Sequence, residues 1–260
     1  MTILDELAAY AKERTSVRRS EISLADMRKM AEELPKGGFL FENNLRKEGI
    51  SFICECKKAS PSKGLIAPDF PYLQIAREYE EAGADCISVL TEPKWFLGSD
   101  EYLRQIASSV KTPCLRKDFT VDEYMIYEAK TLGASAVLLI VSILSEEQLK
   151  EYLELSDSLG LTAIVETHDE DEVGMAVDLK ARVIGVNNRN LKDFTVNTDN
   201  SKNLRKLIPS ETLFIAESGI KTHEDVRSLR EIGADAVLVG ETLMRASDKK
   251  AMLQYLRGDL

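Results

Sequence analysis

A Gly-Ala step followed by an apolar run recurs along this chain. The segments GADCISV (83–89), GASAVLL (133–139) and GADAVLV (233–239) share it, and their glycines lie 50 and then 100 residues apart. A fixed spacing indicates a repeated supersecondary unit. In each copy a helical pattern ends, glycine provides a left-handed turn, and a continuous apolar strand begins. A period of 50 residues corresponds to two strand–helix units.

Five further apolar segments raise the number of predicted strands to eight. They are residues 51–54, 113–115, 161–165, 182–186 and 212–216. Eight apolar strands alternating with helices favour the α/β class and a single closed (β/α)8 TIM barrel, although the local pattern is also compatible with an open sheet. A length of 260 residues suits either one barrel or two smaller domains.

The first 48 residues precede the barrel pattern. Apolar residues with helical spacing predict two amphipathic helices, the second capped by Ser23 and ending near Pro35. We therefore expect a helical extension at residues 1–48, packed on a catalytic barrel at 49–260. The apolar positions of the two helices are Ile3, Leu4, Leu7, Ala8 and Ala11, then Leu24, Met27, Met30, Ala31 and Leu34.

Four capping boxes mark the starts of later helices. In each, a hydroxyl residue precedes an acidic residue or glutamine by three positions, so both side chains can bond the first turn. The predicted pairs are Thr120 with Glu123, Ser145 with Gln148, Thr167 with Glu170, and Thr222 with Asp225.

Net charge, cysteine positions and the lengths of apolar runs limit the binding partners and the cellular location that we expect. A formal net charge of −10 argues against nucleic acid and anionic membranes, because both attract basic surfaces. Four cysteines lie in apolar runs without the spacing of zinc or redox motifs, as expected of reduced core thiols. The sequence has neither a signal-like segment nor 18 consecutive apolar residues. We expect a cytoplasmic protein with a small-molecule ligand and no obligatory protein partner.

Charged residues follow several predicted strands directly. In a barrel the carboxyl ends of the strands meet at one rim, where active sites form. Alternation places Glu55 and Lys57 on one face of the first strand. Any one of these charges alone would most simply be solvated, but their joint placement predicts a shared site. The five that would converge are Glu55, Lys57, Lys117, Glu166 and Glu217.

Close charges of both signs suit acid–base chemistry near neutral pH. Lysine releases its proton more easily when it is desolvated or beside another cation, so Lys57 and Lys117 are expected to act as such a pair. Glu166 lies between Val165 and Thr167. Partial burial there is expected to raise its affinity for a proton and to suit it for proton transfer.

The last two predicted strands are followed by loops that contain glycine. Ser218 and Gly219 follow one strand, and Gly240 and Glu241 follow the other. Glycine lets the backbone approach a ligand closely, and main-chain N–H groups at these two loops can hold a phosphate without a lysine. Each glycine has conformational uses of its own, so the phosphate site is predicted from the pair.

Three aromatic residues and two histidines lie in or near the predicted loops. Trp95 and Phe96 lie in a loop, and Phe119 follows the third strand; each could form a wall for an aromatic substrate or simply pack over the barrel. His168 and His223 lie in capping regions without a partner for metal binding. Nucleotide-binding fingerprints are absent from the sequence, so neither a cofactor nor a metal is expected.

Seven segments in order resemble the indole-3-glycerol phosphate synthase family. The resemblance runs from about residue 50 to the end and has a block after nearly every strand, whereas the first residues carry no strong motif. The blocks are ECKKASPSKG (55–64), ISVLTEPKWFLGS (87–99), LRKDF (115–119), IVET (164–167), IGVNNRNL (184–191), AESGI (216–220) and VLVGETLM (237–244).

The resemblance implies a (β/α)8 enzyme of tryptophan biosynthesis. Its reaction closes the pyrrole ring of 1-(2-carboxyphenylamino)-1-deoxyribulose 5-phosphate with loss of carbon dioxide and water. By resemblance Lys117 is the general acid that protonates the ketone oxygen, Glu166 takes part in proton removal or dehydration, and Lys57, oriented by Glu55, pairs with the substrate carboxylate or assists the second proton transfer. Positioning falls to Ser60, Asn187, Arg189, Glu217 and Ser218, and phosphate binding to backbone at Gly219, Gly240 and Glu241.

One residue departs from the family pattern. Glu241 stands where some members have serine, and a carboxylate repels phosphate, so we expect its side chain to turn away while its N–H faces the ligand. The loop over residues 58–70 contains Pro61, Gly64 and Pro68. Its length and composition predict a lid that excludes water.

Two alternatives stay open from the residues themselves. A lysine in a desolvated barrel mouth could be the nucleophile of a Schiff-base aldolase, which borohydride would trap on Lys117. A barrel that only binds a phosphorylated metabolite would keep its ligand affinity in the Lys117→Ala variant.

Overall fold

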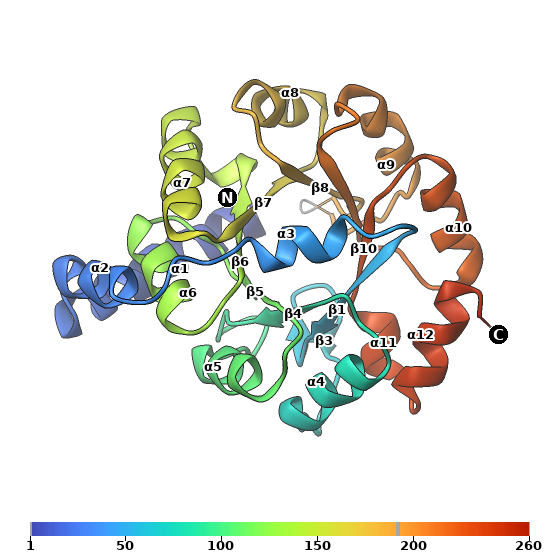
Figure 1. Ribbon diagram of the computed structural model, residues 1–260, viewed down its shortest axis with the longest axis horizontal. Helices are drawn as coiled ribbons and strands as arrows, with labels where there is room; N and C mark the ends of the chain where they lie inside the picture. Colours follow the sequence, from blue (N-terminus) through green and yellow to red (C-terminus); the bar gives the residue numbers. More distant parts are fainter. Residues whose placement is uncertain (1, 191–192, 260) are drawn as a thin grey trace.

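The computed structural model describes residues 2–190 and 193–259, and within them eight parallel strands form a closed barrel (Figure 1). The order around the barrel is β1-β10-β9-β8-β7-β6-β5-β4, so each strand lies beside the strand that follows it in this series of βα units. The (β/α)8 prediction is confirmed, and the open sheet is excluded. The strands are β1 (Ser51–Cys56), β4 (Cys86–Leu90), β5 (Cys114–Lys117), β6 (Ala136–Ile140), β7 (Thr162–Thr167), β8 (Val183–Asn187), β9 (Leu213–Glu217) and β10 (Ala236–Val239).

Helices surround the barrel and create two apolar layers. Side chains that point inward, such as Ile53, Leu115 and Ile164, fill the barrel, whereas their neighbours on the outer face pack against the helices. The helices after β1 are α4 (Tyr72–Glu81), α5 (Asp100–Ser109), α6 (Glu123–Thr131), α7 (Glu146–Leu159), α8 (Glu170–Asp178), α9 (Asp199–Leu204), α10 (His223–Glu231), α11 (Glu241–Arg245) and α12 (Lys249–Arg257), with 3-10 turns η1 (Val141–Ile143) and η2 (Arg205–Leu207).

Three helices precede the barrel. The predicted pair is present as α1 (Ile3–Glu21) and α2 (Leu24–Glu32), with Ser23 as the cap of α2. A short third helix, α3 (Leu40–Leu45), was not expected. It lies across the centre of the barrel in Figure 1 and closes the end where the strands begin. Phe41 and Leu45 of α3 are buried against the inner apolar layer.

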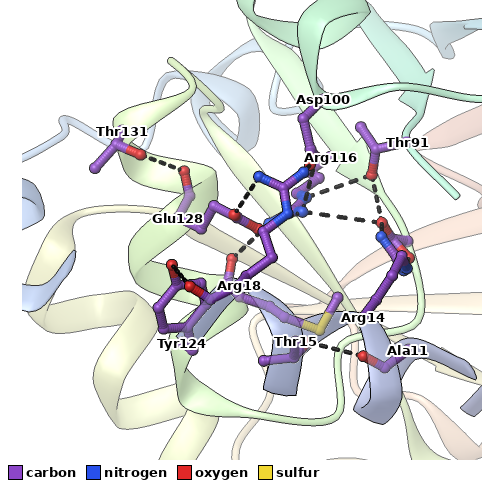
Figure 2. Close-up of polar contacts among 12 residues, drawn as sticks. Ala11, Arg14, Thr15, Arg18, Thr91, Asp100, Arg116, Tyr124, Glu128 and Thr131 are labelled. Atoms are coloured by element: carbon purple, nitrogen blue, oxygen red, sulfur yellow. Dashed lines mark hydrogen bonds and ion pairs between the residues drawn. The ribbon is translucent and has the colours of Figure 1, made fainter. Parts of the chain in front are cut away.

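Helix α1 is attached to the opposite rim by arginines (Figure 2). Arg14 bonds Asp118 at 2.7 Å, and Arg18 pairs with Asp100 and with Glu128, the latter at 3.0 Å. Asp118 directly follows Lys117, the last residue of β5. The extension therefore contacts the end of the strand that carries the predicted acid.

Two of the four predicted capping boxes are correct. Ser145 and Thr222 each cap a helix and exchange both hydrogen bonds with their partners. Thr120 and Thr167 do not, because an aspartate nearer each first turn, Asp122 or Asp169, is the N-cap instead. Thr167 stays in β7 and donates its hydroxyl hydrogen to the carbonyl of residue 185 at 3.1 Å.

The predicted lid contains a small antiparallel hairpin formed by β2 (Ala59–Ser60) and β3 (Gly64–Leu65). The N–H of Ala59 donates to the carbonyl of Phe96 at 3.2 Å. This bond joins the loop after β1 to the loop after β4, so the hairpin is held against the neighbouring rim.

The structure also describes the state of the cysteines and the length and polarity of the helices. All four cysteines are buried, free thiols, and burial raises the pKa of Cys114 to about 12, which keeps this thiol protonated and unreactive. Across the part of the chain that the structure describes, every helix is too short or too polar to cross a membrane.

Candidate active site

The side chains at the carboxyl ends of the strands converge on one cavity of about 440 Å³. Alternation along β1 turns Glu55 and Lys57 into it, whereas Cys56 packs in the outer layer. Every predicted site residue except Ser60 lines the cavity. The residues so placed are Glu55, Lys57, Phe96, Lys117, Phe119, Glu166, Asn187, Arg189, Glu217, Ser218, Gly219, Gly240 and Glu241.

Ser60 lies in the hairpin of the β1 loop. Its side chain is buried, and its hydroxyl lies 3.5 Å from that of Ser62 rather than on the cavity wall. Contact with a ligand in the cavity therefore requires a movement of the hairpin.

Lys57 and Lys117 are each paired with carboxylates. Lys57 forms an ion pair with Glu55. Lys117 Nζ lies 2.9 Å from Glu166 Oε2 and 3.5 Å from Glu217 Oε2. The glutamates are 2–3% exposed, so these interactions are shielded from water.

These pairs overturn the expected proton affinity of Lys117. Burial lowers its pKa, but the charges of Glu166, Glu217 and Glu55 outweigh burial, so the pKa of Lys117 is raised above its ordinary value. We had expected a neighbouring cation to ease proton release. Instead the nearest groups to Lys117 are carboxylates, which keep it charged.

The two glutamates beside Lys117 have opposite behaviour. Burial alone would raise the pKa of Glu166, but Lys117 and His168 lower it, so Glu166 stays ionised and the expected increase in its proton affinity is wrong. For Glu217, burial and the charges of Glu166 and Glu55 raise the pKa to about 7 against the opposing effect of Lys117. Glu217 is therefore the carboxyl group able to hold a proton near neutral pH.

The raised pKa of Glu217 predicts a pH dependence of stability. Between pH 4.5, the ordinary pKa of a glutamate, and about pH 7, Glu217 binds a proton in the folded protein but not in the unfolded chain. The protonated Glu217 therefore contributes its full stability to the folded protein below pH 4.5, and this contribution is lost as the pH rises through 7. The free energy of unfolding of the wild type minus that of Glu217→Gln should fall across this range and then level. Urea denaturation over a pH series measures it. The exposed Glu101→Gln is the control; a difference independent of pH for Glu217→Gln would contradict the assignment.

Glycines make room for the charged side chains. A Cβ on Gly185 in β8 would overlap Glu217 Oε1, and a Cβ on Gly240 would overlap Glu55 Oε1 and come within 2.8 Å of Lys57 Nζ. Residue 185 pairs with Glu166 in the register of β7 and β8. Gly185 therefore leaves the space in which Glu166 and Glu217 both reach Lys117, a role that the sequence analysis missed.

Gly185→Ala should displace the Glu217 carboxylate and lower kcat by about tenfold, since a small misplacement of a reacting group is costly. Gly174→Ala is the matched control, because a Cβ at that position in α8 meets nothing within 4 Å. Steady-state kinetics on both variants test this expectation. Equal kcat values for the two would show that Gly185 is not needed for the geometry of Glu217.

The glycine-containing loops form another part of the cavity wall, and Gly240 lies directly against Glu55 and Lys57. Ser218 and Gly219 both have left-handed backbone, with φ of 70° and 87°. A Cβ on Gly219 would lie 2.7 Å from Val196 Cγ1, so a side chain does not fit there. The left-handed backbone of Ser218 is strained, and such backbone persists only where its surroundings impose it.

Two cationic residues that the sequence did not predict also line the cavity. Lys221 and Arg245 belong to the cavity wall. The Glu241 carboxylate accepts a hydrogen bond from Arg245 Nε at 3.0 Å and lies 3.9 Å from Lys63 Nζ. Its charge is thus directed to cations. Lys221 and Arg245 escaped prediction because they follow the strand ends by several residues.

The aromatic residues divide between wall and packing. Phe96 and Phe119 line the cavity with ring centroids 6.0 Å apart. Trp95 packs edge-on against Tyr10 of α1, with ring centroids 5.6 Å apart. Buried Glu92 shapes this loop by accepting backbone N–H bonds from residues 94–96 at 2.8–2.9 Å. Its role was also missed.

The amides and arginine after β8 form the remaining wall. Asn187 donates its amide hydrogen to Glu166 Oε1 at 3.1 Å and accepts the N–H of Arg189 at 3.0 Å. The Arg189 guanidinium bonds the carbonyl of Phe194 at 3.1 Å. The motif at 184–191 ends at Leu191, which lies outside the described residues. Among residues 2–190 and 193–259, groups of three or more His, Cys, Asp or Glu side chains that could hold a metal ion do not occur.

Solved structures resemble the fold at low sequence identity. A 3-hexulose-6-phosphate synthase superposes with a TM-score of 0.62 at 15% identity, covering 81% of this chain and 100% of its own. A thiamine phosphate pyrophosphorylase from Pyrococcus furiosus gives 0.60 at 17%, with coverages of 84% and 96%. These similarities concern the barrel alone.

Sequence relatives are much closer. The profile of the family described as indole-3-glycerol phosphate synthase matches residues 4–256. The indole-3-glycerol phosphate synthase of Ruminiclostridium cellulolyticum is 52% identical over 257 residues, covering 98% of this chain and 99% of that protein. The enzyme of the same name from Leuconostoc mesenteroides is 54% identical over 260 residues, covering 99% of each. This chain therefore belongs to the indole-3-glycerol phosphate synthase family.

Proposed function

We propose that this chain converts 1-(2-carboxyphenylamino)-1-deoxyribulose 5-phosphate into indole-3-glycerol phosphate by acid–base catalysis in the 440 Å³ cavity. The ring carbon that bears the carboxylate bonds to the ketone carbon, and carbon dioxide leaves to restore the aromatic ring. Loss of the new hydroxyl as water, with one proton from the adjacent methylene, completes the indole. The observation that carries this proposal is the charged Lys117 held between Glu166 and Glu217.

Lys117 is the general acid of ring closure. The ketone oxygen gains negative charge as the new bond forms, and a protonated amine beside it donates a hydrogen bond and then the proton. A protonated amine has no free electron pair with which to attack a carbonyl, so the raised pKa of Lys117 favours this role over a Schiff base.

The glutamates serve the dehydration. Glu166 is ionised and can accept the methylene proton, while Glu217 can carry the proton that leaves with the hydroxyl as water. Lys57, held by Glu55, faces the substrate carboxylate. Asn187 orients Glu166 through the hydrogen bond to its Oε1.

The remaining wall positions the substrate. Apolar side chains at Phe96, Phe119 and Leu138 offer a surface to the anilino ring. The backbone of Gly219, Gly240 and Glu241, with Lys221 and Arg245 near it, holds the phosphate. Arg189 and Ser218 contact carboxylate and hydroxyl groups, and Ser60 joins them when the hairpin moves.

The proposed function also includes the domain bounds, the ligand and the cellular compartment of the enzyme. We take residues 49–260 as the catalytic barrel and residues 1–48 as its extension, with a phosphorylated small molecule as the only ligand needed. Four buried thiols suit a reducing compartment, so we place the protein in the cytoplasm.

Purified protein mixed with the carboxyphenylamino substrate should develop the fluorescence of an indole product. Release of carbon dioxide in equal amount identifies the decarboxylation. Binding of substrate without fluorescence would leave the chain a binding barrel, and substrate trapped on Lys117 by borohydride would make it an aldolase.

A further inference from the structure

A chain of polar contacts extends from the surface of the barrel to Lys117 through His168. Ser142 Oγ donates to Glu172 Oε1 at 2.6 Å, and Glu172 Oε2 lies 3.0 Å from His168 Nδ1. On the other side of the ring, His168 Nε2 lies 3.4 Å from Glu166 Oε1. Glu166 in turn contacts Lys117. His168 has no role in the proposed reaction so far.

Local structure turns His168 toward Glu166. His168 follows Thr167, the last residue of β7, so alternation continues and places residues 166 and 168 on the same face. Helix α8 then begins, with Glu172 in its first turn. Glu172 accepts the backbone N–H of His168 at 2.7 Å as well as facing its ring. One carboxylate therefore fixes both the backbone and the imidazole.

Two carboxylates beside the ring of His168 favour the charged imidazolium over the neutral imidazole. Its two nitrogens each face a carboxylate, and a neutral ring would present a lone pair to one of them. Among the described residues, buried Nε2 makes no hydrogen bond of ordinary geometry, and the Glu166 carboxylate, with Oε1 3.4 Å away, is its ion-pair partner. Burial lowers the pKa of His168, but Glu166 and Glu172 raise it to about 10. Asp5 and Asp169, which line the adjoining cavity, add negative charge.

We propose that His168 is a positioning residue of this reaction: as an imidazolium held by Glu172 and Ser142, it orients Glu166 and balances part of its charge. The inference rests on the proposed function. Glu166 contacts two cations, whereas Glu217 contacts Lys117 at a longer distance. Without the imidazolium, the full charge of Glu166 acts on Lys117, which then holds its proton more tightly and is a weaker acid. Glu166 Oε1 would also lose one of its two contacts and keep only the hydrogen bond from Asn187.

The charge of His168 can be measured without any assay of activity. The chain has two histidines, so His223→Gln assigns the two sets of imidazole signals in a ¹⁵N spectrum of the labelled protein. At about pH 8 an unperturbed histidine is mostly neutral. We expect both nitrogens of His168 to be protonated at this pH, and Glu172→Gln to lower the pH at which the ring loses its proton. A neutral His168 in the wild type would overturn the proposal.

Kinetics then test the effect on Lys117. His168→Gln keeps a hydrogen-bond donor but removes the charge, so kcat should fall by about tenfold, the effect of one pKa unit. KM should change little, because His168 does not line the substrate cavity. His223→Gln is the matched control, since His223, the first residue of α10, contacts the carbonyl of Leu256 in α12 and does not line the cavity. It should retain wild-type kcat.

The outcomes separate this inference from the proposed function. A wild type that makes no indole product contradicts the proposed function, while the ¹⁵N spectrum still decides whether His168 is charged. An active wild type with a charged His168, but with equal kcat for His168→Gln and His223→Gln, overturns the positioning role alone. If His168→Gln fails to fold, Glu172→Gln replaces it, with the same expected loss in kcat.

Discussion

Lys117→Ala is expected to lower kcat by at least about 10²-fold, the effect of losing a general acid. The developing alkoxide loses its proton donor, and Glu166 and Glu217 are left as two buried carboxylates without the cation between them. KM should change far less, because the residues proposed to bind the phosphate and the ring lie elsewhere on the wall. Steady-state measurement of indole formation separates the two constants.

The control for this variant is a lysine outside the cavity. Lys29→Ala removes an exposed charge of α2, which lies 4.0 Å from the carboxylate of Glu33, and should leave kcat unchanged. Isothermal titration with the substrate gives the affinity of both variants. Near-wild-type kcat in Lys117→Ala would remove Lys117 from the chemistry, whereas loss of binding without loss of kcat would make it a binding residue.

Arg116→Met is expected to lower the free energy of unfolding by about 3 kcal/mol, because it breaks a buried ion-pair network. The Arg116 side chain is 3% exposed and pairs with Asp100 at 2.8 Å and Glu128 at 2.7 Å. Alternation along β5 turns Arg116 toward Asp100 and Glu128 (Figure 2), whereas Lys117 lines the cavity. Methionine fills most of the volume, so the loss reports on charge, and urea denaturation measures it.

An exposed arginine provides the comparison. Arg28 pairs with Glu32 one turn away in α2, and both side chains are at least half exposed. Such pairs contribute less than about 1 kcal/mol, so Arg28→Met should have little effect. Equal losses for the two variants would mean that burial of the Arg116 network adds nothing to stability.

Much of the fold was predictable because barrel strands have a simple signature. Strands buried on both faces are continuous apolar runs, and the Gly-Ala steps at Gly83, Gly133 and Gly233 mark where helices end. The closed ring then brings distant strand ends together, so Lys117 and Glu166 could be assigned to one rim from position alone. Helix α3 escaped prediction because six residues carry too little periodicity.

Charge states were less predictable, since they depend on distances between side chains. The sequence places lysines and glutamates at the rim but does not say which contact which. Lys117 was expected to have a cation as its neighbour, yet it lies between carboxylates. Glu166 was expected to gain proton affinity, yet Lys117 and His168 lower its pKa. A signal for His168 existed, since it follows Glu166 by two residues at a strand end.

The measurement that tests the account most directly is a crystal structure with the substrate analogue whose ketone is reduced to an alcohol. We expect its ring against Phe96 and Phe119, its phosphate at Gly219 and Gly240, and Lys117 Nζ within about 3 Å of the new hydroxyl. An analogue bound outside the cavity, or one whose hydroxyl contacts another group while Lys117 stays turned to Glu166, would contradict the assignment of Lys117 as the acid.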